Sequence, residues 1–487
     1  MDSISNCLQG PLLVVCLPVP QGILLLPDRE LWVCGMRQLQ GVLGQNRNLP
    51  PFDGCSHDAE GDNTGGSTSM PKRQRRMEKP RHLYLVLDDW PWGYGIRELD
   101  LLSDSDADDH HQLTPAERST PTRATSRRHL PAAILHFEAE RGEPSYFAGA
   151  FGSKILATQP IVTSGLHRRP LDDGLPVYDV RARSFMLGPR RWTTASASPV
   201  VYVSAGGMLL ALAAGDGGFE VLQPPPRDEA DWEGFTWAWR RVPAGLPFRP
   251  EDVASHAVHP DGKTLFVSVV GGGGAADTTV TLSFDTAEIV IRNGDDGEWI
   301  SNRDDGGYEW KRRGQWRLPF AGRGYYDRGL DAWFGLSGDP GTIGHLCSCD
   351  VVPTYWYCSD DDGHKQCPAV KIGQEKLFSE VPDERHIGAT LVYMGDGGKF
   401  CLIECIYIVQ ADDELTDYSD VEEEEESGDE AVTEEKVPER FIRLTTFSAR
   451  YDKCGDLTTG NGRRLQYYSV PEEVTEPMLE NPVAFWM

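Results

Sequence analysis

Five residues in one short segment have the types that bind zinc. They are Cys347, Cys349, Cys358, His364 and Cys367, all within 21 residues. Structural zinc sites use thiolate sulfur and imidazole nitrogen, usually from cysteines two to four residues apart. The first two cysteines here are in alternate positions, which share one face of a strand, and buried free thiols pack as small hydrophobic groups. The sequence therefore favours buried thiols, keeps a zinc site as the alternative, and leads us to expect no cofactor.

The motifs of common catalytic sites are absent from the sequence. The glycine tract at 271–274 is not followed by the Lys-Ser/Thr of a phosphate-binding loop, and no Gly-x-Ser-x-Gly or His-Glu-x-x-His is present. His256 and His259 are three residues apart in a predicted strand, so they face opposite sides, and His259 belongs to a predicted His-Pro-Asp-Gly turn. We therefore predict no catalytic residues and favour an enzymatic role less than a binding role.

A basic block lies at residues 71–81 and has the sequence PKRQRRMEKPR. Runs of this kind act as nuclear-import signals or contact polyanions. The residues that would form the import signal are Lys72, Arg73, Arg75 and Arg76. The alternative is a solvated basic linker before the first strand, and the sequence leaves both interpretations open.

The strongest acidic run is at residues 411–436, which hold fourteen acidic residues and one lysine, or −13 of the formal net charge of −28. Its like charges repel and it has little apolar surface to bury, so we expect a disordered loop that could engage a basic protein partner. Ser419 and Ser427 precede acidic residues in the manner of acidophilic-kinase sites, or are ordinary loop residues. The overall negative charge argues against binding to the nucleic-acid backbone.

Cysteine use and hydropathy indicate the compartment. The 11 cysteines are few for 487 residues, their number is odd, and no Asn-x-Ser/Thr sequon occurs. The apolar runs near the N-terminus are interrupted by Pro18, Pro20 and Pro27, and none approaches the roughly 20 residues that span a bilayer. We expect an intracellular protein of the nucleus, the cytoplasm or both, without a membrane partner.

Short strands dominate the sequence from residue 82 onward. Runs of five to nine aromatic and β-branched residues, such as HLYLVL, KTLFVSVV and KFCLIECIYIV, alternate with turns rich in Gly, Pro and Asp. Such spacing is typical of antiparallel all-β structure.

Two internal repeats lie within these strands. In the first repeat, a strand ends in an acidic residue that is expected to accept backbone N–H groups in a turn. Its copies are at Asp100, Asp179, Asp285 and Asp350, with looser copies at Glu220 and Asp452. The second repeat is a Trp-rich strand that closes in Leu-Pro-Phe, at residues 237–248 and 310–320. Its tryptophans are expected to pack between neighbouring sheets. These copies predict a kelch-like β-propeller of about six four-stranded blades with insertions.

Several segments resemble a plant family that is expanded in grasses and numbered 1668 among the domains of unknown function. The similar segments are HLYLVLDDW (82–90), HPDGKTLFVSV (259–269), GRGYYDRGLDAWFGL (322–336), HLCSCDV (345–351), ERHIGATLVYMGDGGKFCLIEC (384–405) and LTTFSARYDKCGDL (444–457). The resemblance spans about residues 82–466. It implies a kelch-like, propeller-type fold and no particular activity.

These observations predict an organisation and a kind of function. Residues 1–69 are expected to be a disordered or artefactual extension, 70–81 a basic linker, 82–470 the propeller with its acidic insertion, and 471–487 a C-terminal tail. The predicted function is a non-catalytic platform for protein interaction. The alternatives are an enzyme with its active site in the central channel and a substrate receptor of a ubiquitin ligase.

Overall fold

The computed structural model describes most of the chain from residue 81 onward, and two short segments before it. The described residues are 23–25, 31–33, 81–101, 127–158, 161–162, 174–193, 200–214, 218–226, 237–271, 279–291, 299–301, 309–354, 367–395, 397–409, 438–460 and 462–487.

Within these ranges, six antiparallel meanders of four strands follow one another along the chain. The first consists of β33 (Val483–Trp486), β3 (Leu83–Trp90), β4 (Gly93–Leu99) and β6 (Ala133–Glu138). The second consists of β7 (Phe147–Ala150), β8 (Lys154–Ala157), β10 (Leu175–Asp179) and β11 (Ser184–Gly188). The third consists of β13 (Val200–Ala205), β14 (Met208–Ala213), β15 (Phe219–Leu222) and β16 (Arg240–Arg241).

The other three meanders follow the same order. The fourth consists of β17 (Val253–Val258), β18 (Thr264–Val270), β19 (Thr279–Asp285) and β22 (Lys311–Gly314). The fifth consists of β23 (Gly322–Asp327), β24 (Ala332–Leu336), β25 (His345–Asp350) and β26 (Val370–Lys376). The sixth consists of β27 (Glu384–Gly395), β28 (Lys399–Ile408), β29 (Arg440–Ser448) and β32 (Arg464–Ser469).

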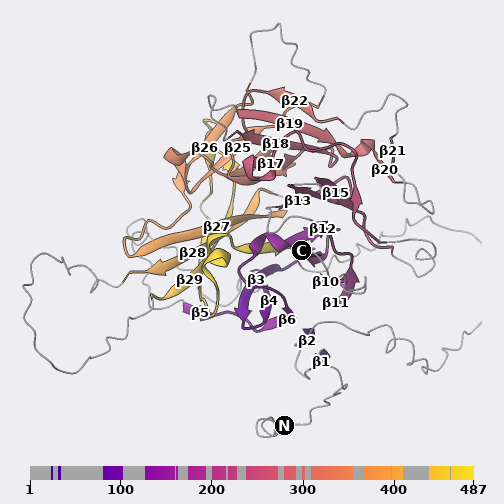
Figure 1. Ribbon diagram of the computed structural model, residues 1–487. Helices are drawn as coiled ribbons and strands as arrows, with labels where there is room; N and C mark the ends of the chain where they lie inside the picture. The colour runs from indigo at the N-terminus through magenta and orange to yellow at the C-terminus, as the bar shows by residue number, and fades with distance from the viewer. Residues whose placement is uncertain are drawn as a thin grey trace, which may run out of the picture.

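The meanders are arranged around a centre, close to which the C-terminus lies (Figure 1). The first strand of each meander is innermost, and β17 and β23 pair in parallel, so that the fourth and fifth meanders form one continuous sheet. The C-terminal strand β33 pairs antiparallel with β3, which joins the two ends of the propeller. An all-β, propeller-type fold is therefore confirmed.

Hydrophobic clusters fill the spaces between neighbouring sheets. One cluster combines Val177 of the second meander with Leu209 of the third, and another combines Phe219 of the third with Phe284 of the fourth. The second strand of each meander has a neighbouring sheet on both faces, so its sequence is a nearly continuous apolar run: all six residues of β14 are buried. Outer strands face solvent and are polar, as β26 is.

Both internal repeats have a defined place in the fold. Five of the six acidic residues lie on, or directly after, the third strand of a different meander, and Asp452 follows the short strand β30 (Arg450–Tyr451), which comes after the third strand of the sixth meander. As predicted, Asp179 accepts hydrogen bonds from the backbone N–H groups of Arg181 and Ala182, and Asp452 does the same with Cys454 and Asp456.

The tryptophans of the second repeat pack between sheets, as predicted. The indole N–H of Trp239, beside β16 of the third meander, donates to the carbonyl of Pro189 after the second meander. Trp316 is buried in the cluster between the fourth and fifth meanders. The sequence therefore identified contacts between neighbouring sheets.

The two ends of the chain differ from the predicted organisation. The segment 471–487 is not a tail: it supplies the innermost strand of the first meander, and the hydrogen bonds that join His82 and Met487 continue this pairing. Two strands from the predicted extension, β1 (Ile23–Leu25) and β2 (Leu31–Val33), lie at the outer edge of the same sheet, where β2 pairs with β6. Both ends of the chain are placed by strand pairing with segments distant in the sequence, and no local sequence pattern predicts such pairing.

Seven shorter strands lie outside the meanders or extend them. They are β5 (Arg127–His129), β9 (Ile161–Val162) with β12 (Trp192–Thr193), β20 (Ile289–Ile291) with β21 (Trp299–Ser301), and β30 (Arg450–Tyr451) with β31 (Leu457–Thr458). In the part of the chain that the structure describes, the α-helix α1 (Glu476–Glu480) is one turn long, and no helix there has the length and hydropathy to cross a membrane.

Candidate functional site

The predicted zinc ligands are not brought together in the described part of the chain. Cys347 and Cys349 lie on β25 in the cluster between the fourth and fifth meanders, and Cys367 is exposed. Burial raises the pKa of both buried thiols, that of Cys349 to about 12, which opposes the thiolate form that binds metals. Cys358 and His364 lie outside the described residues, so the zinc hypothesis stays a prediction.

The other sites predicted from the sequence also lie outside the described residues. These are the import-signal residues Lys72, Arg73, Arg75 and Arg76 and the serines Ser419 and Ser427. The two histidines discussed above are described: His256 lies on β17 and His259 in the turn after it, where the imidazole lies 3.0 Å from the carboxylate of Asp261. The prediction that His259 belongs to the turn is confirmed.

Two kinds of connection share one side of the ring, which we call the proximal face. They are the connections between consecutive meanders and those between the second and third strands of each meander. Backbone hydrogen bonds join the two kinds: Ala139 donates to Trp92, Ala321 to Leu336, and Val409 to Asp383. The innermost strands begin at this face, and the connection that contains the acidic segment 411–436 leaves β28 and enters β29 there.

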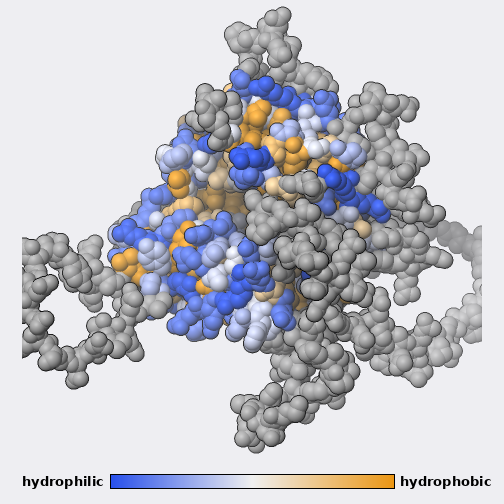
Figure 2. All heavy atoms as spheres, in the orientation of Figure 1, coloured by the Kyte–Doolittle hydropathy of each residue, from blue (hydrophilic) through white to orange (hydrophobic). Residues whose placement is uncertain are grey.

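Two large hydrophobic side chains are exposed on the proximal face. Trp92, in the turn between β3 and β4, is 66% exposed, and Ile343, in the connection between β24 and β25, is 53% exposed. Figure 2 shows hydrophobic side chains lying between hydrophilic ones on the described surface of the ring seen in that view. Tryptophan is the residue type most enriched at binding hot spots, so its exposure in a short turn marks a candidate contact residue.

A buried ionic network lies where β27 begins at the proximal face. The carboxylate of Glu404, on β28, is fully buried and lies 2.5 Å from the Arg443 guanidinium of β29. It also accepts hydrogen bonds from the backbone N–H of Ser379, at 3.1 and 3.2 Å. Its partner on β27 is His386, whose Nδ1 lies 3.1 Å from the same carboxylate. The guanidinium of Arg443, the backbone N–H of Ser379 and the imidazole of His386 therefore surround and stabilise this buried negative charge.

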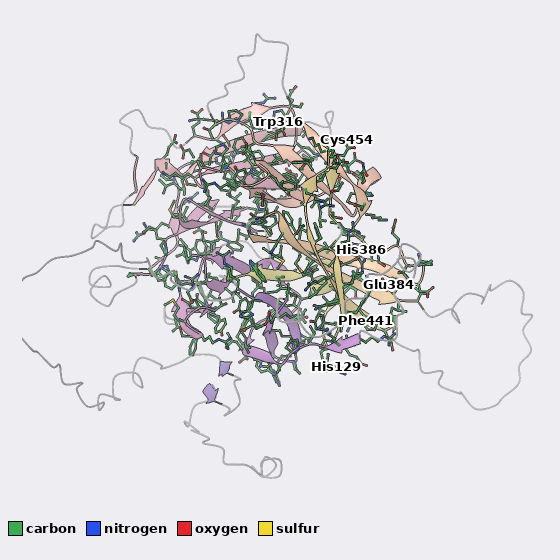
Figure 3. All side chains as sticks on the ribbon, turned by 180° about the vertical axis from the view of Figure 1, so that it is seen from behind. His129, Trp316, Glu384, His386, Phe441 and Cys454 are labelled. Carbon is green, nitrogen blue, oxygen red and sulfur yellow. The ribbon has the colours of Figure 1, made fainter. Side chains whose placement is uncertain are left out.

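His386 is the exposed end of this network. Its ring stacks on Phe378 with centroids 4.1 Å apart, and its side chain is 37% exposed. Figure 3 shows His386 and Glu384 along the same side of the molecule as Phe441 and His129, away from Trp316. A carboxylate that orients an imidazole through Nδ1 is the geometry of a general base. However, Nε2 has no hydroxyl or thiol partner among the described residues, so no catalytic triad is formed there.

A histidine and an arginine point toward the centre of the ring. In the continuous sheet formed by the fourth and fifth meanders, Ala257 of β17 faces the cluster enclosed between them, as does its register partner Gly324 of β23. The preceding pair in register, His256 and Arg323, alternates to the opposite face. At the innermost strands that face is directed at the centre.

The two side chains differ in burial and are electrostatically coupled. His256 is 9% exposed, its Nε2 is buried without a hydrogen-bond partner, and Arg323 is exposed. Burial, and then the positive charge of Arg323, lower the pKa of His256 to about 3. His256 is therefore neutral at physiological pH.

This coupling predicts a pH dependence of stability. The pKa of His256 in the folded state is below its value in the unfolded chain, so its contribution to stability is complete above about pH 6.5 and is lost as the pH falls toward 3. Relative to His256→Asn, we expect the wild-type free energy of unfolding to fall by up to about 1.4 kcal/mol per pH unit in this window. Urea midpoints measured between these pH values test the prediction. The same change of midpoint with pH in the wild type and in His256→Asn would contradict it.

Most residues of the candidate sites described above were not predicted from the sequence. Trp92 had a signal, because it lies between Pro91 and Gly93 in a short turn, where an aromatic residue has little to pack against. His386, Glu404 and Arg443 come from three strands, and their charges do not form a motif along the sequence. Arg323 had no signal in the sequence, because only the parallel pairing of β17 with β23 brings it beside His256.

Comparisons with known proteins give a family and a weak structural similarity. No curated protein matches this chain. Among solved structures, the periplasmic gluconolactonase PpgL of Pseudomonas aeruginosa aligns with 12% identity and a TM-score of 0.30, over 80% of this chain and 99% of that one. The model of the family described as "Protein of unknown function (DUF1668)" matches residues 80–468. This match covers most of the chain and all the strands of the meanders except β33 and the last residue of β32, and the chain therefore belongs to the DUF1668 family.

Proposed function

We propose that the chain is a non-catalytic protein-interaction platform that binds its partner on the proximal face. The observation that carries this proposal is the exposure of Trp92, 66% of which is accessible in a turn of the first meander. An exposed indole leaves apolar surface in water, which burial against a partner would remove at roughly 25 cal/mol per Å². Ile343 adds a second exposed apolar group to the same face.

The turn that presents Trp92 is held closely by its surroundings. The Trp92 carbonyl accepts a hydrogen bond of 3.1 Å from the backbone N–H of Ala139. Gly93 follows, and a side chain there would collide with the backbone of Phe137 and Ala139. A contact residue on a fixed turn loses little conformational entropy on binding, which favours affinity.

The charge of the chain supports a partner with a basic surface. The acidic segment 411–436 is attached at the proximal face between β28 and β29, and its net charge of −13 would attract such a surface electrostatically. We include an intracellular location in the proposal, because the described cysteines are free thiols and two of them, Cys367 and Cys454, are exposed.

Substitution of Trp92 tests the proposal. We expect Trp92→Ser to reduce recovery of reproducible partners in proximity labelling by at least about tenfold, as the loss of a hot-spot residue does. The melting temperature should stay unchanged, because the side chain is exposed. The matched control is Val370→Ser at the start of outer strand β26, on the opposite side of the ring, which removes an apolar side chain that is 45% exposed.

Two outcomes would overturn the proposal of a protein-interaction platform. One is the absence of any reproducible partner, and the other is a set of partners unchanged by Trp92→Ser. Recovery of ubiquitin-ligase subunits that depends on Trp92 would specify the platform as a substrate receptor. An enzyme is the less favoured alternative, and His386 with its carboxylate partner Glu404 is the group that would carry it.

A further inference from the structure

The centre of the ring contains a buried polar atom without a partner. This atom is Nε2 of His256, which makes no hydrogen bond although its side chain is buried. Leaving a buried donor or acceptor unpaired costs free energy, and native proteins rarely do so unless a water, an ion or a ligand completes the site. The neutral imidazole can present an N–H at this position, since its pKa is lowered to about 3.

Arg323 adds a positive charge beside this atom. Its Cα is the register partner of His256 across the parallel β17–β23 pair, so both side chains lie on the face directed at the centre. Its guanidinium carbon lies 4.7 Å from the centroid of the Tyr325 ring, which orients the guanidinium plane. In the described residues no carboxylate forms an ion pair with Arg323, although the whole chain has a net charge of −28.

A guanidinium and an adjacent N–H form a donor set for an oxyanion. The guanidinium fork matches two oxygens of a carboxylate or phosphate and forms charge-assisted hydrogen bonds with them. A neutral imidazole supplies a third donor without adding a second charge that would repel the first.

We propose that the centre of the ring binds a small oxyanion, with the Arg323 guanidinium as its charged anchor and His256 as a second donor. The oxyanion is a carboxylate or phosphate group of a small molecule. This site is independent of the proposed contact through Trp92, so either proposal can fail without the other.

The test uses the purified full-length chain and two probes, sodium malonate and sodium phosphate. Each is titrated at neutral pH with the ionic strength held constant by sodium chloride, and binding is measured by calorimetry and by the shift in melting temperature. We expect saturable binding of at least one probe, weakened at least about tenfold by Arg323→Gln. Binding of malonate alone identifies a carboxylate site, and binding of phosphate alone identifies a phosphate site.

Control variants separate a specific site from general attraction. Arg328→Gln removes an exposed arginine just after the other end of β23 and should leave binding unchanged. Arg323→Lys keeps the charge without the planar fork and should weaken binding less than Arg323→Gln does. His256→Asn should also weaken binding, and if that buried substitution prevents folding, the two exposed Arg323 variants still decide the result.

Three results would overturn the proposal. The first is the absence of saturable binding by both probes. The second is wild-type affinity in Arg323→Gln. The third is an equal loss in Arg328→Gln, which would show that the anion responds only to the net charge of the surface.

Discussion

Deletion of residues 483–487 is expected to abolish cooperative unfolding of the propeller. These residues contain β33, whose pairing with β3 joins the first and last segments of the ring, and Met487 exchanges backbone hydrogen bonds with His82. Val483, Phe485, Trp486 and Met487 also pack on the cluster shared by the sixth, first and second meanders. We expect the free energy of unfolding to fall by about 5 kcal/mol or more, which is comparable to the whole stability of a domain. Circular dichroism melts and size-exclusion chromatography measure it.

A conservative substitution in the same strand provides the control. The indole N–H of Trp486 is buried without a partner, so Trp486→Phe keeps the strand pairing and most of the apolar contact while removing an unsatisfied donor. We expect this variant to unfold cooperatively near the wild-type temperature. If the deleted chain melted like the wild type, the ring would not depend on β33 for closure.

Arg443→Met is expected to destabilise the fold by about 3–5 kcal/mol, because it leaves the Glu404 carboxylate buried without its cationic partner. The substitution also removes a hydrogen bond of 3.0 Å from the guanidinium to the carbonyl of Leu377, which links the fifth and sixth meanders. Denaturant midpoints at constant slope measure the change.

The double variant Glu404→Gln with Arg443→Met tests whether the unpaired buried charge causes the loss of stability. It removes the buried negative charge together with its partner, so we expect it to be more stable than Arg443→Met alone. Arg249→Met provides an exposed comparison, because Arg249 forms a bidentate pair with Asp252 in solvent, and its loss should not change the midpoint measurably. If the double variant were as unstable as the single one, lost packing and not the unpaired charge would be the cause.

The fold could be predicted largely from local patterns in the sequence. Asp179, Asp285 and Asp452 each close a strand with a side chain that accepts nearby backbone N–H groups, and such turns need only two to four neighbouring residues. The apolar run of β14 predicts a strand covered on both faces, as it is. The inter-sheet position of Trp239 and Trp316 follows from the large area that a buried indole contributes.

The candidate sites could not be predicted in this way. Glu404, His386 and Arg443 read as ordinary charged or polar positions on three strands, and only their register makes them one network. The cysteines gave the opposite case: the alternate spacing of Cys347 and Cys349 favoured buried thiols over a metal site, and both are buried in a hydrophobic cluster. Residue type alone does not distinguish these outcomes, because burial decides which ionisation state is stable.

The sequence by itself determined the all-β, repeating architecture, since turn chemistry and strand periodicity depend on residues close together in the chain. The tertiary structure decided how the ring closes and what faces its centre. Thr475 donates to the buried carboxylate of Asp88 from 387 residues away, and β33 pairs with β3, which begins at Leu83. Such contacts depend on the curvature accumulated over all the meanders, and a residue such as Arg323 becomes the neighbour of His256 only when the strands that carry them are paired.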